Sequence, residues 1–432
     1  MSERLEVARE LLSDEGVIFI SIDDNEQAQL KLLCDEVFGE SNFVTNIHCQ
    51  LSTTQGMKVK SAQMGNIVKN AEYITVYSKN GVKNIAKQPL YDARLEYDEH
   101  YSLFLKDNGD IVPLKEIYDY RFPKDMANTK PLSLSEAFKK SSEFAEIVRT
   151  HLAEIVRIDK VTGFDLIDEL ECGKWKKINR GDRSYLLTLN ANRKIQQLLR
   201  LKDSWGTTDG YKSPEGLRKI RGDWWEGFYL DMGNVTKEGN MEFKNGKKPI
   251  RLIQQIIKML GNKNLITLDF FAGSGTTGHA VMKLNKEDGG SRKYILCTNN
   301  ENNICEEVTY QRLKNIQEEL PHNLKYFKTD FISKYESDED EETISEKMLE
   351  HIKELIELEH HIEIDGEQYI ILDDEDELDN IVEKIKDGGK VFITSGIFLS
   401  RTHQRILDEK NVTVIDIPEY YYRSELKEIG EL

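Results

Sequence analysis

One stretch of the chain constrains its fold more than any other: an apolar strand that passes through a glycine turn into a helix. It reads Leu268-Asp269-Phe270-Phe271-Ala272-Gly273-Ser274-Gly275-Thr276-Thr277-Gly278. Glycines at 273 and 275 permit backbone dihedrals that are closed to other residues, and they let a ligand lie directly on the main chain. The first amides of the following helix have no partners within it, so they can bind a carboxylate or a phosphate. The pattern predicts an α/β unit with a ligand site at this turn.

Several interpretations of the turn compete. Gly273, Gly275 and Gly278 have the spacing of a dinucleotide-binding fingerprint, which would make the chain a nicotinamide enzyme. A phosphate-binding P-loop is excluded, because no Gly-Lys-Ser/Thr follows. A third interpretation is a site for S-adenosylmethionine, in which the glycines make room for the methionine moiety. The turn is also explained as a purely structural one.

The string FAGSGTTG resembles the cofactor turn of the amino-methylating DNA methyltransferases, and it is more specific than three spaced glycines. The resemblance implies S-adenosyl-L-methionine as the cofactor, with Gly273, Ser274 and Gly275 at its methionine end and Asp269 ordering the turn. The further cofactor-binding positions that it implies are Phe271, Ala272, Thr276 and Thr277.

Two flanking segments also resemble that family. Residues 245–253, NGKKPIRLI, are similar to its Lys-Pro-x-x-Leu-Ile segment, so Lys248 and Pro249 are expected to help close the cofactor pocket. A proline in the first turn of a helix explains them equally well. Residues 294–298 form the next strand, and Asn299 after it is predicted to bind the ribose, with Asn300 and Glu301 as alternatives. The family usually has an acid at that place.

The N-terminal part resembles the modification (Mod) subunit of Type III restriction–modification systems. The similar stretches are residues 1–26, with VIFISIDDNE after Gly16, and residues 71–79, AEYITVYSK. In that family the catalytic motif comes first, the cofactor turn later, and a target-recognition region lies between them. The resemblance implies an N-terminal part of the methyltransferase core at 1–80, a target-recognition and DNA-binding insertion at 81–235, a cofactor-binding part of the core at 236–333, and an acidic α/β domain at 334–432.

The expected fold is therefore α/β: a Rossmann-like methyltransferase sheet with an insertion and a small C-terminal domain. The apolar run Val17–Ile22 predicts a parallel strand covered on both faces. Further predicted elements are a strand at 72–78, a helix at 250–260, a strand at 265–271, a helix at 278–284 and a strand at 293–298. The tail is predicted to alternate helices at 344–359, 375–387 and 400–410 with strands at 368–372, 390–394 and 412–416.

The net charge of −18 is unevenly distributed. Residues 335–432 hold 29 acidic and 10 basic residues, whereas residues 171–225 hold 13 basic and 6 acidic ones. A basic stretch with interleaved aromatic rings is typical of nucleic-acid binding, so double-stranded DNA is the expected partner. The predicted DNA-binding cations are Lys174, Lys176, Lys177, Arg180 and Arg183, and the accompanying aromatic residues are Trp175, Tyr185, Trp205, Trp224 and Trp225.

The catalytic tetrapeptide that the resemblance implies, Asp/Asn/Ser-Pro-Pro-aromatic, has no counterpart in the chain. The eight prolines include no adjacent pair. The tail segment Asp416-Ile417-Pro418-Glu419-Tyr420 is only superficially similar to the tetrapeptide. No catalytic residue is therefore assigned. Because the tetrapeptide stands upstream of the first helix in the family, we expect the chain to be the C-terminal part of a longer or split methyltransferase, inactive alone.

Composition narrows the remaining possibilities. Five separated cysteines without a CxxC favour a reducing cytosol and no metal site. The sequence contains no run of 18 apolar residues, so no membrane-spanning helix is predicted. The acidic N-terminal segment argues against a secretory signal. The function expected is methylation of adenine N6 at specific DNA sites, with cytosine N4 as the nearest alternative. The other alternative function is that of a DNA-binding or partner-binding module without catalysis. A restriction subunit, a missing half and a second copy are the candidate protein partners.

Overall fold

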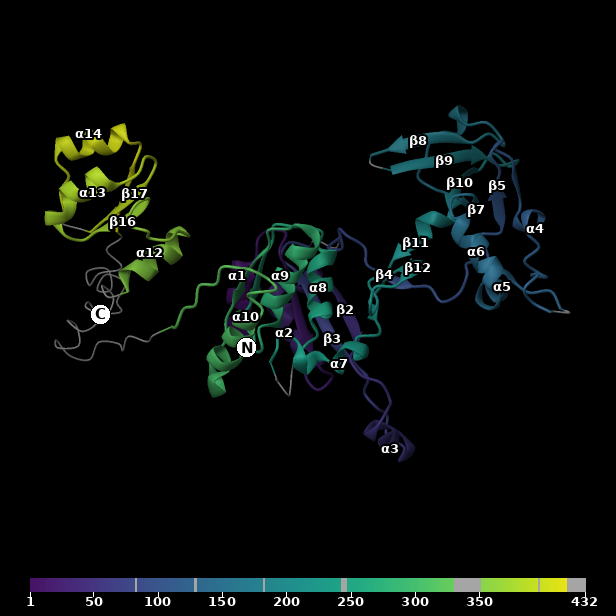
Figure 1. Ribbon diagram of the computed structural model, residues 1–432, viewed down its shortest axis with the longest axis horizontal. Helices are drawn as coiled ribbons and strands as arrows, with labels where there is room; N and C mark the ends of the chain where they lie inside the picture. The colour runs from purple at the N-terminus through teal and green to yellow at the C-terminus, as the bar shows by residue number, and fades with distance from the viewer. Residues whose placement is uncertain are drawn as a thin grey trace. The chain divides into compact units, whose positions relative to one another are not determined.

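A computed structural model describes residues 1–81, 84–127, 130–181, 183–241, 247–329, 351–394 and 397–417. The chain divides into two compact units, Met1–Asn323 and Leu324–Leu432, and Figure 1 shows the fold of each. The division falls shortly before residue 334, where the sequence predicts the acidic domain to begin. The acidic run at 336–342 and the Asn245-Gly246 part of the Lys-Pro segment lie outside the described residues.

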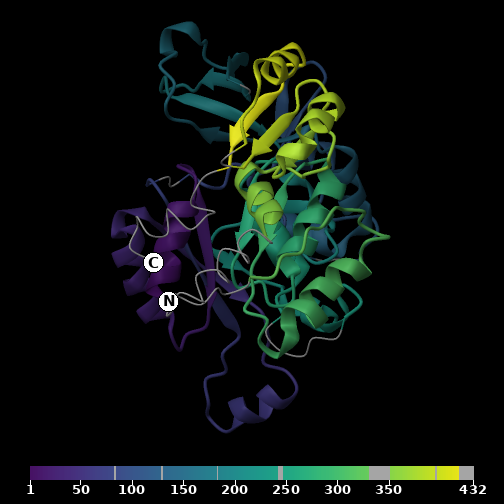
Figure 2. The same ribbon diagram turned by 90° about the vertical axis from the view of Figure 1, so that its left-hand side faces the viewer.

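The first sheet of the larger unit has the strand order β1-β3-β2-β13. Its strands are β1 Val17–Ile22, β2 Phe43–Gln50, β3 Ala71–Ser78 and β13 Trp224–Trp225. Helices α1 (Ser2–Leu11) and α2 (Gln27–Phe38) pack on one face, beside Ile18 and Ile20 of β1. Helix α8 (Ile250–Met259) packs on the other face, beside Val17 and Phe19. Figure 2 shows the purple helices and the green helices on opposite sides of the purple strands.

The strand predicted at 72–78 is confirmed as β3, but the predicted direction of β1 is wrong. β1 is covered on both faces as expected, yet it pairs antiparallel with β3. A continuous apolar run indicates that both faces of a strand are buried, but it does not indicate the direction of the neighbouring strand. The crossover through α2 does leave β2 parallel to β1, but β3 runs antiparallel to both and lies between them.

The second block carries the glycine turn. β14 (Ile266–Asp269) and β15 (Lys293–Leu296) form a parallel pair, and α9 (Thr276–Asp288) packs with α8 through Ile257, Val281 and Leu284. β14 ends two residues earlier than predicted because the turn begins at Phe270. α9 begins two residues earlier than predicted, immediately after Gly275. A π-helical segment, Ile304–Tyr310, leads into α10 (Gln311–Asn315).

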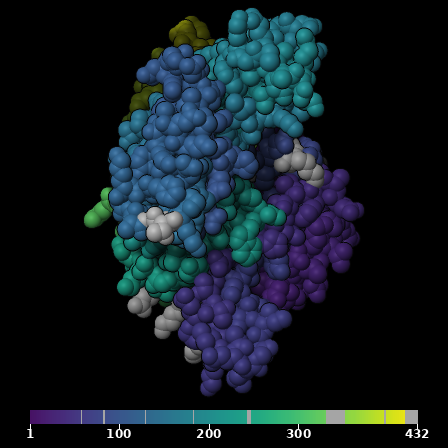
Figure 3. Space-filling model, turned by 90° about the vertical axis from the view of Figure 1, so that its right-hand side faces the viewer, coloured from purple at the N-terminus to yellow at the C-terminus, as the bar shows by residue number. Residues whose placement is uncertain are grey.

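The connection between β2 and β3 carries a short arm. Its helix, α3 (Met57–Gln63), stands away from the sheet in Figure 1 and at the foot of the space-filling view in Figure 3. Met64 and Ile67 on this arm are exposed.

The insertion has two antiparallel sheets. The larger has the order β6-β5-β7-β10-β9-β8, and the smaller has the order β11-β12-β4. Phe144, Leu114, Ile155 and Leu201 are fully buried in its core. Helix α6 is capped by Ser141, whose hydroxyl accepts a hydrogen bond from the Phe144 amide. The strands are β4 Tyr91–Ala93, β5 Leu103–Leu105, β6 Ile111–Pro113, β7 Ile155–Lys160, β8 Lys176–Arg180, β9 Arg183–Leu189, β10 Ile195–Arg200, β11 Trp205–Thr207 and β12 Glu215–Ile220, and the helices are α4 Leu114–Ile117, α5 Leu134–Lys140, α6 Ser142–Thr150 and, after β13, α7 Tyr229–Met232.

The smaller unit has a three-stranded parallel sheet in the order β16-β17-β18. The three predicted tail strands are confirmed as β16 Tyr369–Leu372, β17 Lys390–Ile393 and β18 Thr413–Asp416. The predicted helices at 375–387 and 400–410 are confirmed in shorter form as α13 Leu378–Lys384 and α14 Arg401–Glu409. Of the helix predicted at 344–359, α12 (Ile352–His360) is described, and residues 344–350 lie outside the described part.

Candidate functional site

The glycine turn between β14 and α9 is ordered by one carboxylate. Asp269 Oδ1 accepts a hydrogen bond from the Phe271 amide at 3.1 Å, and Oδ2 accepts one from the Thr277 hydroxyl at 2.6 Å. Gly273 has φ +49° and Gly275 has φ +71°, both in the left-handed region. The Gly275 amide donates to the Ala272 carbonyl at 2.8 Å and closes the turn. The sequence therefore needs glycine here for the backbone path itself.

Two of the glycines are also required by their neighbours. A Cβ on Gly275 would lie 3.0 Å from Thr309 Cγ2, and a Cβ on Gly278 would lie 3.1 Å from Tyr294 and 3.2 Å from Leu313. Gly278 thus lets α9 pack closely on β15. Gly273 differs, because the nearest atom to an added Cβ is the Phe271 carbonyl oxygen at 3.7 Å. Space lies above Gly273, and a ligand can approach the main chain there.

Most polar side chains of the turn point into the protein. Ser274, Thr276 and Thr277 are only 6%, 6% and 7% exposed, and Ala272 is buried as well. Phe271 is the exception: it is 53% exposed, and the Arg4 guanidinium of α1 lies 5.2 Å from its ring centre. Any ligand at this turn therefore meets backbone amides and the Phe271 ring rather than the hydroxyls.

A buried arginine that the sequence analysis missed lies behind the turn. Arg312 of α10 is 0% exposed, and its guanidinium donates to the Ser274 carbonyl at 3.2 Å and to the Thr276 hydroxyl at 2.7 Å. Burial, followed by the nearby Arg312 charge, lowers the pKa of His279 to about 3, so this imidazole is neutral and accepts from Arg312 Nε at 3.4 Å. The signal in the sequence is an arginine at a core position, since Leu313, Ile316 and Leu320 of the same helical region are buried.

The predicted ribose position is exposed at the end of β15. Asn299 and Glu301 bond to each other, with Asn299 Nδ2 donating to Glu301 Oε2 at 3.3 Å. The Asn300 side chain accepts a hydrogen bond from the Cys305 amide at 2.9 Å, so it stabilises the loop. Asn300, Asn302 and Asn303 all have positive φ, which gives this loop a tight left-handed path.

Lys248 and Pro249 lie at the start of α8. The Lys248 ammonium pairs with the Glu72 carboxylate of β3, and Pro249 is the residue that precedes the first helical turn. The Lys248–Glu72 pair joins the start of α8 to the first sheet.

The predicted DNA-binding cations are all exposed, but they do not share one face. Residues alternate along a strand, so Lys176 and Arg180 of β8 lie on the face of Ile178, and Lys177 lies on the opposite face. Lys174 and Lys176 are paired with Glu171 and Glu169 at 2.6 and 3.2 Å. Arg180 and Arg183 lie directly opposite each other in the β8–β9 register.

Of the aromatic residues expected to accompany these cations, Trp225 is buried, which corrects its expected role, and Tyr185 and Trp205 are partly buried in packing clusters. Trp225 is 2% exposed and stacks on Phe228 in the core. Tyr185 packs edge-on against Phe164, with ring centres 5.0 Å apart. Trp224 is 50% exposed and remains available. An aromatic ring in a basic stretch marks the surface only when the strand alternation also points it outward.

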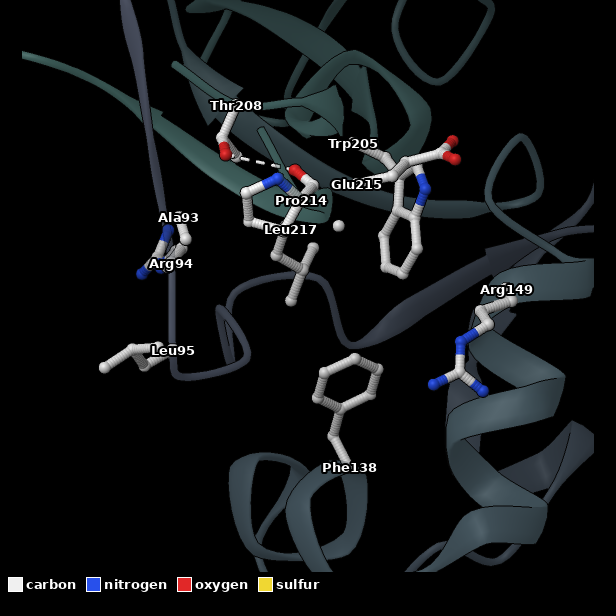
Figure 4. A pocket seen from close by; sticks show the side chains of 11 residues that line it. Ala93, Arg94, Leu95, Phe138, Arg149, Trp205, Thr208, Pro214, Glu215 and Leu217 are labelled. Carbon is white, nitrogen blue, oxygen red and sulfur yellow. Dashed lines mark hydrogen bonds between the residues drawn. The ribbon is translucent and has the colours of Figure 1, made fainter. Parts of the chain in front are cut away.

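A pocket in the insertion is lined by Trp205, Phe138 and Leu217, with Arg149 and Glu215 at its edge (Figure 4). The Thr208 hydroxyl beside it donates to the Pro214 carbonyl at 3.0 Å. The pocket lies in the insertion and does not include the glycine turn. Among the described residues, no group of three or more His, Cys, Asp or Glu side chains is placed to hold a metal ion. No described helix is long and apolar enough to cross a membrane.

The fold and the turn together define an α/β protein with a strand–glycine–helix junction whose backbone is open at Gly273. Comparison with known sequences identifies the class: the chain belongs to the DNA methylase family, whose profile matches residues 1–347. It is 31% identical to the Type III restriction-modification enzyme StyLTI Mod subunit of Salmonella typhimurium over 74% of this chain, and 33% identical to the EcoPI Mod subunit of Escherichia phage P1 over 68%. The chain spans 43% of the length of each of these relatives.

A third relative is the Type II methyltransferase M.KpnI of Klebsiella pneumoniae, which is 28% identical over 76% of both chains. The resemblance to Type III Mod subunits that the sequence motifs indicated is confirmed. The mixed α/β architecture is consistent with a methyltransferase family.

Proposed function

We propose that this chain binds S-adenosylmethionine at the glycine turn and takes part in methylating the N6 amine of adenine in specific DNA sites, as the modification component of a restriction–modification system. The observation that carries the proposal is the turn itself. Gly273 leaves open space above a left-handed backbone, Asp269 orders the loop, and α9 begins directly behind it.

The residues present fit the cofactor. The exposed Phe271 ring and the amides at the start of α9 offer an apolar surface and unpaired donors. Asn299 and Glu301 offer an exposed amide and carboxylate at the end of β15, which suit ribose hydroxyls. When bound, S-adenosylmethionine supplies an activated methyl group. The chain's own contribution is to hold and orient it.

The DNA and protein partners rest on the relatives and on charge. The relatives named above are Mod subunits of restriction-modification enzymes and a methyltransferase. The exposed cations of β8 and β9 suit phosphate contacts. A Res-type restriction subunit is the protein partner proposed.

One observation favours a second function, that of a DNA-binding or partner-binding chain without catalysis. The 432 residues contain no Pro-Pro pair, so the acceptor tetrapeptide expected from the resemblance has no counterpart in them. Methylation would then require another chain to supply the residues that hold the flipped base. Cytosine N4 remains the alternative acceptor, and the resemblance to Mod subunits favours adenine.

Calorimetry tests the cofactor directly. Titration of the full chain with S-adenosylmethionine should give heats that fit binding at a single site, and titration with NAD should give no heat of binding. Heat with NAD alone would make the turn a dinucleotide site and would overturn the proposal.

A further inference from the structure

Arg312 is a cation in a place where a cation is costly. Its side chain is 0% exposed, and burying an ionised group costs several kcal/mol unless partners compensate. Burial lowers the pKa of Arg312 to about 10, so the guanidinium stays charged at neutral pH. The charge is compensated by contacts of the guanidinium with the turn and by an ion pair with Glu238.

Those contacts converge on the glycine turn. Arg312 Nη1 lies 3.2 Å from both the carbonyl and the hydroxyl oxygen of Ser274, and 2.7 Å from the Thr276 hydroxyl. The two hydroxyl oxygens are themselves 3.1 Å apart. The guanidinium therefore draws one carbonyl and two hydroxyls of the turn toward the interior.

A second contact fixes the neighbouring peptide. The Thr309 hydroxyl, one turn before Arg312, donates to the Gly273 carbonyl. Because a trans peptide is planar, its N–H points opposite to its C=O. The Ser274 amide on the same peptide therefore points away from Thr309.

The far side of the guanidinium is also occupied. Glu238 Oε2 lies 3.6 Å from Arg312 Nη2, so the two form an ion pair but no hydrogen bond, and the Glu238 carboxylate accepts a hydrogen bond from the Ile250 amide at 3.2 Å. The path of the side chain is cleared by Gly239, where a Cβ would lie 2.5 Å from Arg312 Cγ. The start of α8, Arg312 and the turn thus form one connected network.

We infer that Arg312 is a positioning residue of the cofactor site: held by Glu238 on one side, it fixes Ser274 and Thr276 from behind, so that the turn presents its main chain to the methionine end of S-adenosylmethionine. This rests on the proposed function of the turn. Arg312 does not touch the ligand, and it acts through the backbone that does.

Lysine is a poor replacement, because an ammonium is a point charge that cannot reproduce the planar fork of a guanidinium. Arg312→Lys is expected to weaken binding of S-adenosylmethionine by about 10- to 100-fold, the usual range for losing hydrogen bonds to a charged group. Lys314→Met is the matched control, since Lys314 is an exposed cation of the same helix. It should leave the affinity unchanged.

The test is a double-mutant cycle in the Kd for S-adenosylmethionine, measured by calorimetry on the full chain with Arg312→Lys, Thr276→Val and both together. The two changes should be non-additive, because each removes the same contact, and the salt dependence of DNA binding should not change. A purely structural role would reduce DNA binding and cofactor binding together. If the Arg312 variant fails to fold, Thr276→Val alone decides the question.

The outcomes separate the two proposals. Absence of S-adenosylmethionine binding in the wild-type chain would overturn the proposed function and this inference with it. Wild-type binding with unchanged affinity in Arg312→Lys, or in Thr276→Val where the arginine variant does not fold, would overturn the inference alone.

Discussion

Gly273 and Gly289 form a matched pair that tests the cofactor site. Both have left-handed backbones, with φ +49° and +69°, at opposite ends of the segment that contains α9. A Cβ at Gly289 meets no atom within 4 Å, and one at Gly273 meets only the Phe271 carbonyl oxygen at 3.7 Å. A valine at either position should therefore cost about 1–2 kcal/mol of unfolding free energy from the left-handed conformation and little from contacts.

The two variants should differ in ligand binding. Gly273→Val places a branched side chain in the space above the turn, where the cofactor is expected to lie. Forcing extra carbons into an occupied site costs about 1–3 kcal/mol, which corresponds to about a 5- to 150-fold increase in Kd. Gly289→Val lies at the far end of α9 and should leave Kd at the wild-type value.

The assay combines two measurements on each variant: urea denaturation for the unfolding free energy, and calorimetry for the Kd of S-adenosylmethionine. Similar losses of stability with a selective loss of binding in Gly273→Val are the expected result. If Gly273→Val binds as tightly as Gly289→Val, the ligand does not lie on this turn, and the reasoning from the open space above Gly273 is refuted.

Three further outcomes are expected. Replacing Lys174, Lys176, Lys177, Arg180 and Arg183 with glutamine should lower the slope of log K against log salt for duplex DNA by about 0.9 for each phosphate that the protein no longer neutralises. As a control, the same change at five cations of the smaller unit should leave this slope unchanged; they are Lys384, Lys386, Lys390, Arg401 and Arg405. If the variant of the β8–β9 cations has the same slope as the wild-type chain, these cations do not face DNA. A chain of residues 1–323 should keep the wild-type Kd for S-adenosylmethionine, because the division into units falls there; an insoluble product would contradict this. Residues 1–432 alone should not incorporate radiolabelled methyl groups into DNA, and robust incorporation would mean that residues other than a Pro-Pro motif hold the acceptor.

The local elements that the sequence predicted depend on short-range signals. The glycine turn, β3 and the three tail strands follow from runs of apolar residues and from glycine positions, which act within a few residues. The antiparallel pairing of β1 with β3 could not be predicted in this way. It depends on β3 lying between β1 and β2, and the relevant pairing joins residues such as Val17 and Ser78 that are far apart in the chain.

The site was predictable in its backbone and not in its support. Gly273, Gly275 and Asp269 are recognisable because their roles require these residue types at this spacing. Thr309 and Arg312 reach the turn from a distant segment, Glu238 reaches Arg312 from another, and only tertiary packing brings them together. The orientation of the basic stretch was also missed, because charge composition does not say on which face of a strand each cation lies.

Helix α8 connects the proposed cofactor site to the insertion. Its first amide is held by Glu238, which faces Arg312 behind the glycine turn. Further along the helix, Lys258 pairs with Asp209 of the insertion at 2.6 Å, and Gln255 accepts a hydrogen bond from the buried Arg221.

One face of α8 packs on the first sheet through Leu252 and Ile256, and Ile257 packs on α9. A helix fixed at its start, on two faces and along its polar side cannot shift at one contact without straining the others, because packed interiors are dense and resist deformation. The insertion and the glycine turn are therefore both anchored to helix α8. It follows that changes in the α8 contacts, such as removal of the Lys258–Asp209 pair, should disturb the placement of the insertion relative to the turn while leaving the local structure of each intact.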